Sequence, residues 1–437
     1  MRHYLDYKKR FKSYFIGILA ITLFIIPFVF SYAQTVSDLN TRIAEKNQDI
    51  MQLEREIAAY QTQLDDLGKQ KNSLSSSIAA LDLTRKKLIA DISLTQKKID
   101  KTNLKIQNLS SQINTKEKSI SVNSDAIKSE IRQVNEMELS SMMEIILSEK
   151  DFSFVWNDIE NMATINSRIR EHIIALREVK GELEDTRTET LDAKKELSDF
   201  KSELADQKKI VDQNTAEKKK LLAQTKNNEV NYQKLLKDRL TQKDAFEKEL
   251  RDYESQLKYI LDPSTLPSGG VLSWPLNSIL ITQVFGKTEA GKRLYANGTH
   301  NGVDFRASVG TPVKAMADGV VAGRGDTDTQ CAGVSFGRFV LIKYNNGLAS
   351  TYGHLSLIKA NTGDKVARGD VVGYSGNTGY STGPHLHVSL YAKNAVEVKT
   401  LPSKSCPGRI LTQPIAPINA YLDPLFYLPP TVSSMFK

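Results

Sequence analysis

Residues 35–261 lack the two residue types that most often interrupt helices. The stretch contains no proline, and its only glycines are Gly68 and Gly181. By contrast, 12 of the 13 prolines lie from Pro263 onward and 21 of the 24 glycines lie from Gly269 onward. Because proline and glycine disfavour helix interiors and favour turns, the chain is not one uniform globular fold. We expect a long helical region followed by a compact, turn-rich domain.

An apolar residue recurs at nearly every seventh position from Val36 to Val134. Thirteen of these fifteen positions are apolar, mostly isoleucine, and a second series that is mostly leucine runs three residues further on. This is the a and d pattern of a coiled coil. A comparable apolar series runs from Ile169 to Leu257. Polar residues interrupt the first series, Lys71 among them, and mark candidate bends.

The two apolar series predict two helical arms, residues 35–140 and 159–261, of 106 and 103 residues. Each arm would extend about 160 Å if it were fully helical. Similar lengths favour an antiparallel hairpin that buries its own seam. A parallel homodimer stays open as an alternative, because isoleucine at a with leucine at d also suits two parallel helices.

The heptad phase breaks between the arms, at the expected hairpin tip near residues 141–165. Methionine and the aromatic residues Phe152, Phe154 and Trp156 are concentrated there. Aromatic residues and methionine are favoured at protein interfaces. The tip is therefore either a small core that closes the turn or a docking surface for a partner.

Residues 1–33 have the order of a secretory signal. Basic residues precede the 16-residue apolar run Phe15–Phe30, and small residues ending at Ala33 follow it, as a signal peptidase requires. We expect cleavage after Ala33, with an uncleaved membrane anchor as the alternative. Either outcome predicts an extracytoplasmic protein, which is secreted, periplasmic or attached to the cell envelope.

The net charge of +8 raises the question of nucleic-acid binding. Lysine and arginine are, however, interleaved with aspartate and glutamate along the helical region, which is the pattern of a solvated coiled-coil surface. We therefore expect no nucleic-acid partner. A weak attraction to anionic membranes or cell-wall polymers is compatible with the charge.

Residues 262–270 are expected to form a linker, and residues 271–430 a β-dominated domain. The linker is rich in proline, serine and glycine, which end helices and form turns. Beyond it, short β-branched runs alternate with glycine-rich turns, the pattern of an antiparallel sheet. The clearest expected strands are Val313–Val321, Phe339–Tyr344, Val371–Tyr374 and His385–Tyr391.

Four of the six histidines lie in this domain, three of them in two short motifs. In the first motif, His300 and Asp304 are four residues apart, too far on a straight strand to share one ion. Gly302 permits a turn that brings imidazole and carboxylate together. Both groups bind zinc at about 2.0–2.2 Å.

In the second motif, His385 and His387 flank Leu386. Residues two apart on a strand face the same side, so one histidine can bind a metal while the other reaches a water, and Leu386 points into the core. His354 ends another expected strand and adds an imidazole. Three protein ligands and one open position define a catalytic zinc site, in which the ion polarises a carbonyl and activates water.

These motifs resemble the LytM/lysostaphin-type zinc metallopeptidases of bacterial cell walls. The resemblance covers roughly residues 271–428 and includes Gly310–Val313, Tyr352–Leu355, Gly376–Gly379 and Asp423–Leu425. It implies hydrolysis of peptide bonds in peptidoglycan with Zn²⁺ as the cofactor.

The resemblance also implies a role for each residue of the two motifs and for His354. His385 would be the general base, and His354 would orient the water or stabilise the oxyanion. The metal ligands would be His300, Asp304 and His387.

The order of coiled coil and peptidase domain resembles exported members of that family, the EnvC-like murein hydrolase activators and the PcsB- and RipC-like division hydrolases. It implies a role in cell division and docking of the tip, through Phe152, Phe154 and Trp156, on an FtsE–FtsX-like membrane complex. Many EnvC-like members have lost zinc ligands and only activate other hydrolases, whereas all five positions are filled here. We therefore expect a zinc metalloendopeptidase that its coiled coil positions or regulates, with a non-catalytic activator as the alternative.

The only two cysteines are Cys331 and Cys406. Outside the cytoplasm such a pair can oxidise, so we expect a disulfide, with two free thiols as the alternative. The cysteines lie in stretches that are longer than the corresponding turns of the family, Arg324–Gly337 and Asn394–Pro417. We expect both stretches to flank the cleft.

Overall fold

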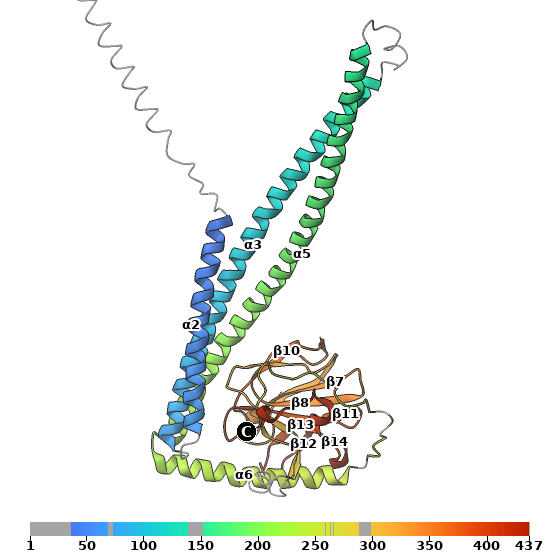
Figure 1. The fold of residues 1–437 in the computed structure, drawn as a ribbon. Helices are drawn as coiled ribbons and strands as arrows, with labels where there is room; N and C mark the ends of the chain where they lie inside the picture. The colour runs from blue at the N-terminus through green and yellow to red at the C-terminus, as the bar shows by residue number, and fades with distance from the viewer. Residues whose placement is uncertain are drawn as a thin grey trace, which may run out of the picture. The chain divides into compact units, whose positions relative to one another are not determined.

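The computed structural model describes residues 36–436, apart from 69–72, 139–151, 258, 263, 265 and 288–298 (Figure 1). The expected signal segment and part of the expected tip lie outside the described residues. The chain divides into two compact units. The first unit contains residues 1–47 and 101–195, and the second contains residues 48–100 and 196–437.

Among the described residues, no helix combines the length and the apolar character needed to cross a bilayer.

In the part of the chain that the structure describes, the helical region consists of four long helices, which confirms the expected class of fold. Their polar contacts define antiparallel pairs within the one chain. In the first unit, Lys116 forms an ion pair with Glu182 at 3.1 Å. In the second unit, Lys218 pairs with Asp82 at 2.5 Å. The helices are α2 (Val36–Gly68), α3 (Leu74–Glu138), α5 (Phe152–Thr225) and α6 (Glu229–Gln256), and the two ion pairs join α3 to α5.

The expectation of a continuous first arm over residues 35–140 is wrong. Helix α2 ends before α3 begins, and the two run antiparallel. In the first unit Asn108 donates to Asn40 over 2.8 Å, and in the second unit Lys97 pairs with Asp49 at 2.8 Å. The interruption at Lys71 falls between these helices, within residues that are not described. The isoleucine and leucine repeat therefore serves two antiparallel helix pairs, α2 with α3 and α3 with α5.

The second arm, expected over residues 159–261, is also interrupted. Lys226 and Asn227 adopt left-handed backbone angles, with φ of 49° and 53°, a conformation that asparagine tolerates better than most residues. The Asn228 side chain then caps α6 by accepting from the backbone N–H groups of Val230 and Asn231. Helix α6 is consequently separate from α5 and ends at Gln256.

The C-terminal domain is β-dominated and antiparallel, as expected. Its ten-stranded sheet has the order β1-β4-β11-β8-β7-β6-β9, with β10 pairing with β5 and β8, and β14 pairing with β11. The expected strand Val313–Val321 is in fact two strands separated by a turn. The strands of this sheet are β1 (Ile281–Gln283), β4 (Val303–Arg306), β5 (Pro312–Lys314), β6 (Gly319–Asp326), β7 (Arg338–Tyr344), β8 (Leu348–Ile358), β9 (Lys365–Val366), β10 (Val371–Ser375), β11 (His385–Ala392) and β14 (Tyr421–Leu422).

Two small two-stranded sheets and a short helix complete the domain. One sheet ends at His300, the first residue of the first motif, and the other lies within the long stretch Asn394–Pro417. These elements are β2 (Gly286–Lys287) with β3 (Thr299–His300), β12 (Glu397–Pro402) with β13 (Ile410–Ile415), and α8 (Pro424–Tyr427).

The centre of the large sheet is buried on both faces. Alternate residues of β7, such as Val340 and Ile342, enter the main core, whereas Leu341 between them enters a second cluster with Ala349 and Tyr391. Residues of the β12–β13 hairpin and its flanks cover this second cluster. The long stretch Asn394–Pro417 therefore forms part of the core of the domain.

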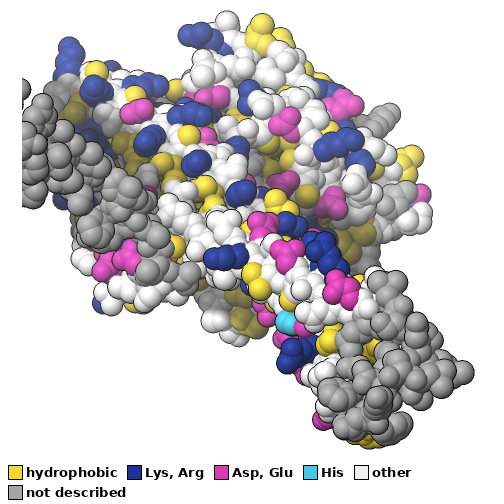
Figure 2. Space-filling model, turned by 90° about the horizontal axis from the view of Figure 1, so that it is seen from above, with side chains coloured by type: hydrophobic (Ala, Val, Ile, Leu, Met, Phe, Trp, Pro, Cys, Tyr) yellow, Lys and Arg dark blue, Asp and Glu magenta, His cyan; other side chains and the backbone are white. Residues whose placement is uncertain are grey.

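Basic and acidic side chains are interspersed over the face in Figure 2. In the first unit, ion pairs join neighbouring helices, for example Lys105 with Glu189 at 2.9 Å and Arg187 with Glu117 at 3.0 Å. Such exposed pairs contribute about 0–1 kcal/mol each. The arrangement agrees with the expected solvated coiled-coil surface.

The expected disulfide between Cys331 and Cys406 is confirmed. Both residues are buried in a small cluster with Phe246 and Leu411, and 75 positions separate them in the sequence. Replacing both cysteines with serine should lower the free energy of unfolding of the domain by about 4 kcal/mol, because a crosslink over a loop of this size restricts the unfolded chain. Urea denaturation, followed by Trp274 fluorescence in a Trp156→Phe background, would measure the loss.

Reduction of the unsubstituted chain with dithiothreitol is the control for this experiment. It should lower the urea midpoint about as much as the double substitution does. Equal midpoints for the oxidised and reduced chains would contradict the prediction.

Candidate metal centre and active-site cleft

The register of β4 and β11 places Asp304 directly opposite His387. The two strands are antiparallel neighbours, so both side chains project from the same face of the sheet. His300 ends β3, and a bend at residues 301–302 returns the chain to β4. The expected turn between the first histidine and the aspartate is therefore present.

Gly302 is needed at this bend because of the space around it. A Cβ atom there would lie 2.4 Å from the Val388 carbonyl oxygen and 2.7 Å from the His387 ring. Glycine thus lets the bend pack against the imidazole on the neighbouring strand.

Three potential ligand atoms converge between these strands. His387 Nδ1 lies 2.8 Å from Asp304 Oδ1, and His300 Nε2 lies 3.1 Å from His387 Nδ1 and 3.3 Å from Asp304 Oδ1. Neighbouring ligands of a tetrahedral zinc ion are about 3.3 Å apart, given bond lengths near 2.05 Å. Two imidazoles and one carboxylate at these separations suit a zinc ion with one position left for water or substrate.

The second nitrogen of each ligand imidazole has a partner of its own. His300 Nδ1 lies 3.1 Å from the Val284 carbonyl oxygen, which can only accept, so Nδ1 carries the proton and Nε2 is the nitrogen that can bind a metal. His387 Nε2 lies 2.8 Å from Ser389 Oγ, so Nδ1 can face the metal. Such contacts fix the tautomer and the ring orientation of a metal ligand.

His354 and His385 present free nitrogens to the same centre. Their Nδ1 atoms each lie 2.8 Å from a carbonyl oxygen, that of Thr378 and that of Gly383. The Nδ1–H groups must donate to these oxygens, which leaves both Nε2 atoms unprotonated in the neutral rings. The two ring centroids are 4.6 Å apart, and His385 Nε2 lies 3.7 Å from Asp304 Oδ1.

The His354 backbone is held in a left-handed conformation, with φ of 58°. This conformation costs a non-glycine residue roughly 1–2 kcal/mol. The His354 N–H group donates to the Phe336 carbonyl over 2.7 Å, and the imidazole is anchored on Thr378. Neighbouring elements therefore stabilise an otherwise unfavourable orientation of this ring towards the centre.

Burial and close contact set the protonation of the cluster. Burial alone would raise the pKa of Asp304, but the imidazoles of His300 and His385 hold that pKa well below its usual value. Burial lowers the pKa of His354 well below its usual value, and the nearby His385 adds to this. Burial also lowers the pKa of His387. An ionised carboxylate and neutral imidazoles are the forms that bind metal.

The cluster borders a cavity of about 320 Å³ in the second unit. Four of the five expected site residues line the cavity: Asp304, His354, His385 and His387. Ser335 and Phe336, from the stretch that carries Cys331, also line it. Helix α6 contributes a further wall to the same cavity. The residues from α6 are Phe246, Glu247, Leu250, Arg251 and Glu254.

All five residues expected from the sequence meet at this site. His300, Asp304 and His387 form the metal-compatible group, and His354 and His385 stand beside it. The contribution of α6 was not predicted, because Phe246 and Leu250 satisfy the heptad pattern and were assigned to the coiled-coil seam. The supporting contacts of Val284, Thr378 and Ser389 carry no recognisable sequence signal.

Comparisons with known proteins agree with this geometry. Residues 298–399 match the family model described as Peptidase family M23. Residues 298–399 therefore belong to a peptidase M23 domain of the LytM type, which this chain carries behind a long helical region.

Named relatives of this domain include endopeptidases, one of them a peptidoglycan endopeptidase. Peptidoglycan DD-endopeptidase ShyA of Vibrio cholerae is 39% identical over 121 residues, 27% of this chain and 27% of ShyA. DD-carboxypeptidase/endopeptidase Mpg of Neisseria gonorrhoeae is 43% identical over 88 residues, 20% of this chain and 19% of Mpg. Glycyl-glycine endopeptidase ALE-1 of Staphylococcus capitis is 43% identical over 91 residues, 21% of this chain and 24% of ALE-1. The chain thus spans about a quarter or less of the length of these relatives.

Replacing Gly302 with alanine should weaken zinc binding. The added Cβ would collide with the Val388 carbonyl and the His387 ring, so the bend or the ring must move, and disturbance of a ligand's support typically costs 10–100-fold in metal affinity. Zinc affinity can be measured by competition with a chromogenic chelator. Gly383→Ala is the matched control, because a Cβ there meets nothing within 4 Å. Equal zinc affinities of the two variants would contradict the prediction.

Proposed function

We propose that this protein is an exported zinc metalloendopeptidase that hydrolyses peptide bonds of peptidoglycan. The observation that carries the proposal is the convergence of three ligand atoms beside two further imidazoles whose Nε2 atoms are free. The M23 domain and the peptidoglycan endopeptidase among its relatives support the choice of substrate.

In this proposal His300, Asp304 and His387 hold Zn²⁺. The ion, when bound, supplies a Lewis acid that polarises the scissile carbonyl and activates water. His385 Nε2 accepts the proton of the attacking water and later donates it to the leaving amine. His354 Nε2 orients that water or, when protonated, stabilises the developing oxyanion. Burial of the cluster excludes competing solvent.

The proposal includes regulation by the helical region. Phe246 is 3% exposed and, with Leu250, packs against the disulfide cluster while lining the cavity. Glu254 is buried on the same helix face, where it accepts from Tyr421 Oη over 2.8 Å. Burial raises the pKa of Glu254 to about 7. With α6 in this position a peptide strand has little room beside the metal group, so hydrolysis requires α6 to move.

Export and a role in cell division also belong to the proposal. A disulfide is compatible with an oxidising compartment outside the cytoplasm. Trp156 is 62% exposed, as a residue that docks on an FtsE–FtsX-like complex must be. The side chains of Phe152 and Phe154 lie outside the described residues. Docking at this end of the coiled coil would be the event that moves α6.

Displacing α6 should activate the enzyme. Phe246→Asp places a charge in a buried apolar cluster, and loss of a buried phenylalanine alone costs about 3–5 kcal/mol, so the displaced population should rise steeply. We expect at least a tenfold faster release of new amino termini from purified peptidoglycan. Leu240→Asp is the matched control, because this α6 residue is 44% exposed and its substitution should leave the rate unchanged. A Phe246→Asp chain that is folded, binds zinc and is no faster than the unsubstituted chain would contradict regulation by α6.

Removing a metal ligand should abolish hydrolysis. His387→Ala in the Phe246→Asp background should lose at least about 100-fold in rate, since even residues that only support ligands cost 10–100-fold. His172→Ala is the control, because this histidine lies on α5, in the first unit. Release of amino termini and circular dichroism would be measured in parallel. A His387→Ala chain with full activity in this background would refute the proposal, and a zinc-loaded Phe246→Asp chain without hydrolysis would favour a non-catalytic activator of other hydrolases.

A further inference from the structure

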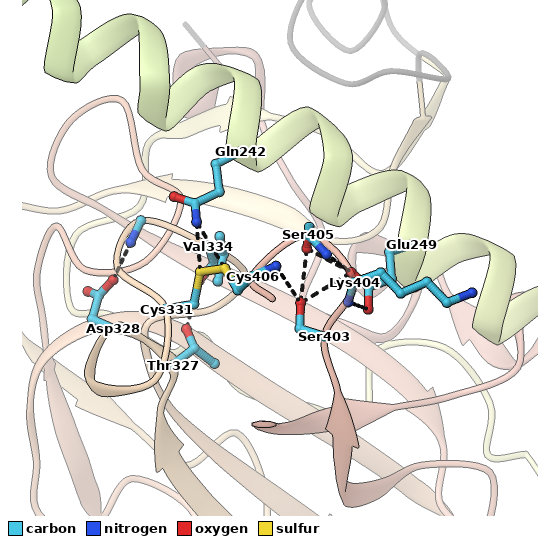
Figure 3. The surroundings of a disulfide bond; sticks show 11 residues. Gln242, Glu249, Thr327, Asp328, Cys331, Val334, Ser403, Lys404, Ser405 and Cys406 are labelled. Atoms are coloured by element: carbon cyan, nitrogen blue, oxygen red, sulfur yellow. Dashed lines mark hydrogen bonds between the residues drawn. A yellow bond between two sulfur atoms is a disulfide. The ribbon is translucent and has the colours of Figure 1, made fainter. Parts of the chain in front are cut away.

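Four hydrogen-bond donors converge on the Glu249 carboxylate beside the β12–β13 hairpin (Figure 3). The backbone N–H of Lys404 donates to Oε1 over 2.7 Å. The backbone N–H and the hydroxyl of Ser405 donate to Oε2 over 2.8 and 2.7 Å. The Ser403 hydroxyl donates to Oε2 over 3.2 Å. The turn therefore contacts both oxygens of the carboxylate.

The donors are held in place by bonds that do not involve α6. The Ser403 hydroxyl accepts from the Cys406 N–H over 3.0 Å. The Ser403 N–H donates to the Arg409 carbonyl over 2.9 Å, and the Arg409 N–H donates to the Cys406 carbonyl over 3.0 Å. The disulfide to Cys331 anchors the end of the turn. The Ser403–Cys406 turn is thus preorganised, and its donors stay oriented when Glu249 leaves.

The chemistry of the turn selects an anion. Two backbone N–H groups and two hydroxyls all donate towards one point, which is the arrangement of an anion-binding backbone nest. Lys404 and Arg409 add positive charge at the exposed edge of the turn. Burial would raise the pKa of Glu249, but the bonds from Lys404 and Ser405 hold it below its usual value. The turn therefore stabilises an ionised carboxylate in particular.

Glu249, which the turn binds, belongs to the helix that lines one wall of the cavity. Leu250, the residue after Glu249, lines the cavity together with His354 and His385. Ser335, which also lines the cavity, donates through its hydroxyl to Gln413 of β13, the strand that follows the turn, over 2.5 Å. A peptide that displaces α6 from the cavity would therefore also expose the donors of the turn.

We propose that the Ser403–Cys406 turn is a carboxylate-binding subsite for the peptide substrate, which Glu249 occupies while α6 covers the cleft. The inference rests on the proposed function and deepens it. Glu249 acts as an internal mimic of a substrate carboxylate, so substrate and α6 compete for the same donors. The ligand is a peptide with a free carboxylate, and the corresponding carboxamide binds more weakly.

Acetate binding to the full exported chain, residues 34–437, tests the subsite itself. The amide NMR signals of Lys404 and Ser405 serve as probes through selective ¹⁵N labelling. Excess acetate should leave these signals unchanged in the parent chain, because Glu249 fills the turn. In the Glu249→Ala variant, both amide signals should shift from their positions in the parent chain. Acetate should shift them back towards those positions with saturation, whereas acetamide should not. Asp252→Ala, which removes an exposed carboxylate from the same helix, should behave like the parent chain.

Two further substitutions test whether the hydroxyl donors of the turn bind the acetate. Adding Ser403→Ala and Ser405→Ala to Glu249→Ala should weaken acetate binding by roughly tenfold or more, since hydrogen bonds to charged groups are lost. Acetate that leaves the Glu249→Ala signals unchanged, or that binds equally well without the two hydroxyls, would overturn the subsite.

A comparison of two peptides tests the assignment to substrate. N-acetyl-D-alanyl-D-alanine should bind Glu249→Ala at least about fivefold more tightly than its C-terminal carboxamide, given the strength of charge-assisted hydrogen bonds. Equal binding of acid and amide would overturn the assignment. These readouts do not depend on turnover. A chain that binds acetate in the turn but hydrolyses no peptidoglycan refutes the proposed function alone, and a chain that hydrolyses peptidoglycan without binding acetate refutes the subsite alone.

Discussion

The pairing register of β4 and β11 is the constraint on which the rest of the site depends. It sets Asp304 opposite His387, and a slip of one residue would turn one of the two side chains to the other face of the sheet. The register is fixed by burial, because Val303, Phe305, Leu386 and Val388 fill the main core on the opposite side. The same alternation of residues therefore specifies both the packing of the core and the positions of the metal-compatible side chains. The imidazoles of His300, His385 and His387 converge on the ionised Asp304.

A second level of organisation surrounds this centre. The disulfide joins two long stretches of the domain, and these stretches carry an apolar cluster that contacts Phe246 and Leu250 and a polar turn that contacts Glu249. Tyr421 of β14 adds a contact to Glu254. Gln242 adds a contact to the disulfide itself, with Nε2 at 3.0 Å from Cys406 Sγ (Figure 3). Apolar and polar contacts thus hold α6 against the cavity beside the metal-compatible group. Such a helix can leave the cavity as one element, which makes it suited to control by an external partner.

The sequence predicted a β-dominated domain, although it merged β5 and β6, and it predicted the five residues that the structure brings together, because periodicity and side-chain chemistry are local signals. Leu386 between His385 and His387 predicted a strand with both imidazoles on one face, and that is the arrangement of β11. The helical region was harder to predict. The same isoleucine and leucine repeat satisfies one long arm or two shorter antiparallel helices, and only the conformations of Lys226 and Asn227 and the cap at Asn228 separate α6 from α5. The role of α6 at the cavity depends on tertiary contacts that no spacing encodes.

Anomalous diffraction at the zinc edge, from crystals of the zinc-loaded protein, would locate the metal. One peak is expected about 2.0–2.2 Å from His300 Nε2, Asp304 Oδ1 and His387 Nδ1, with His354 and His385 outside bonding distance. A zinc ion held by His354 or His385 in place of one of these ligands, or no peak there at full zinc loading, would contradict this expectation.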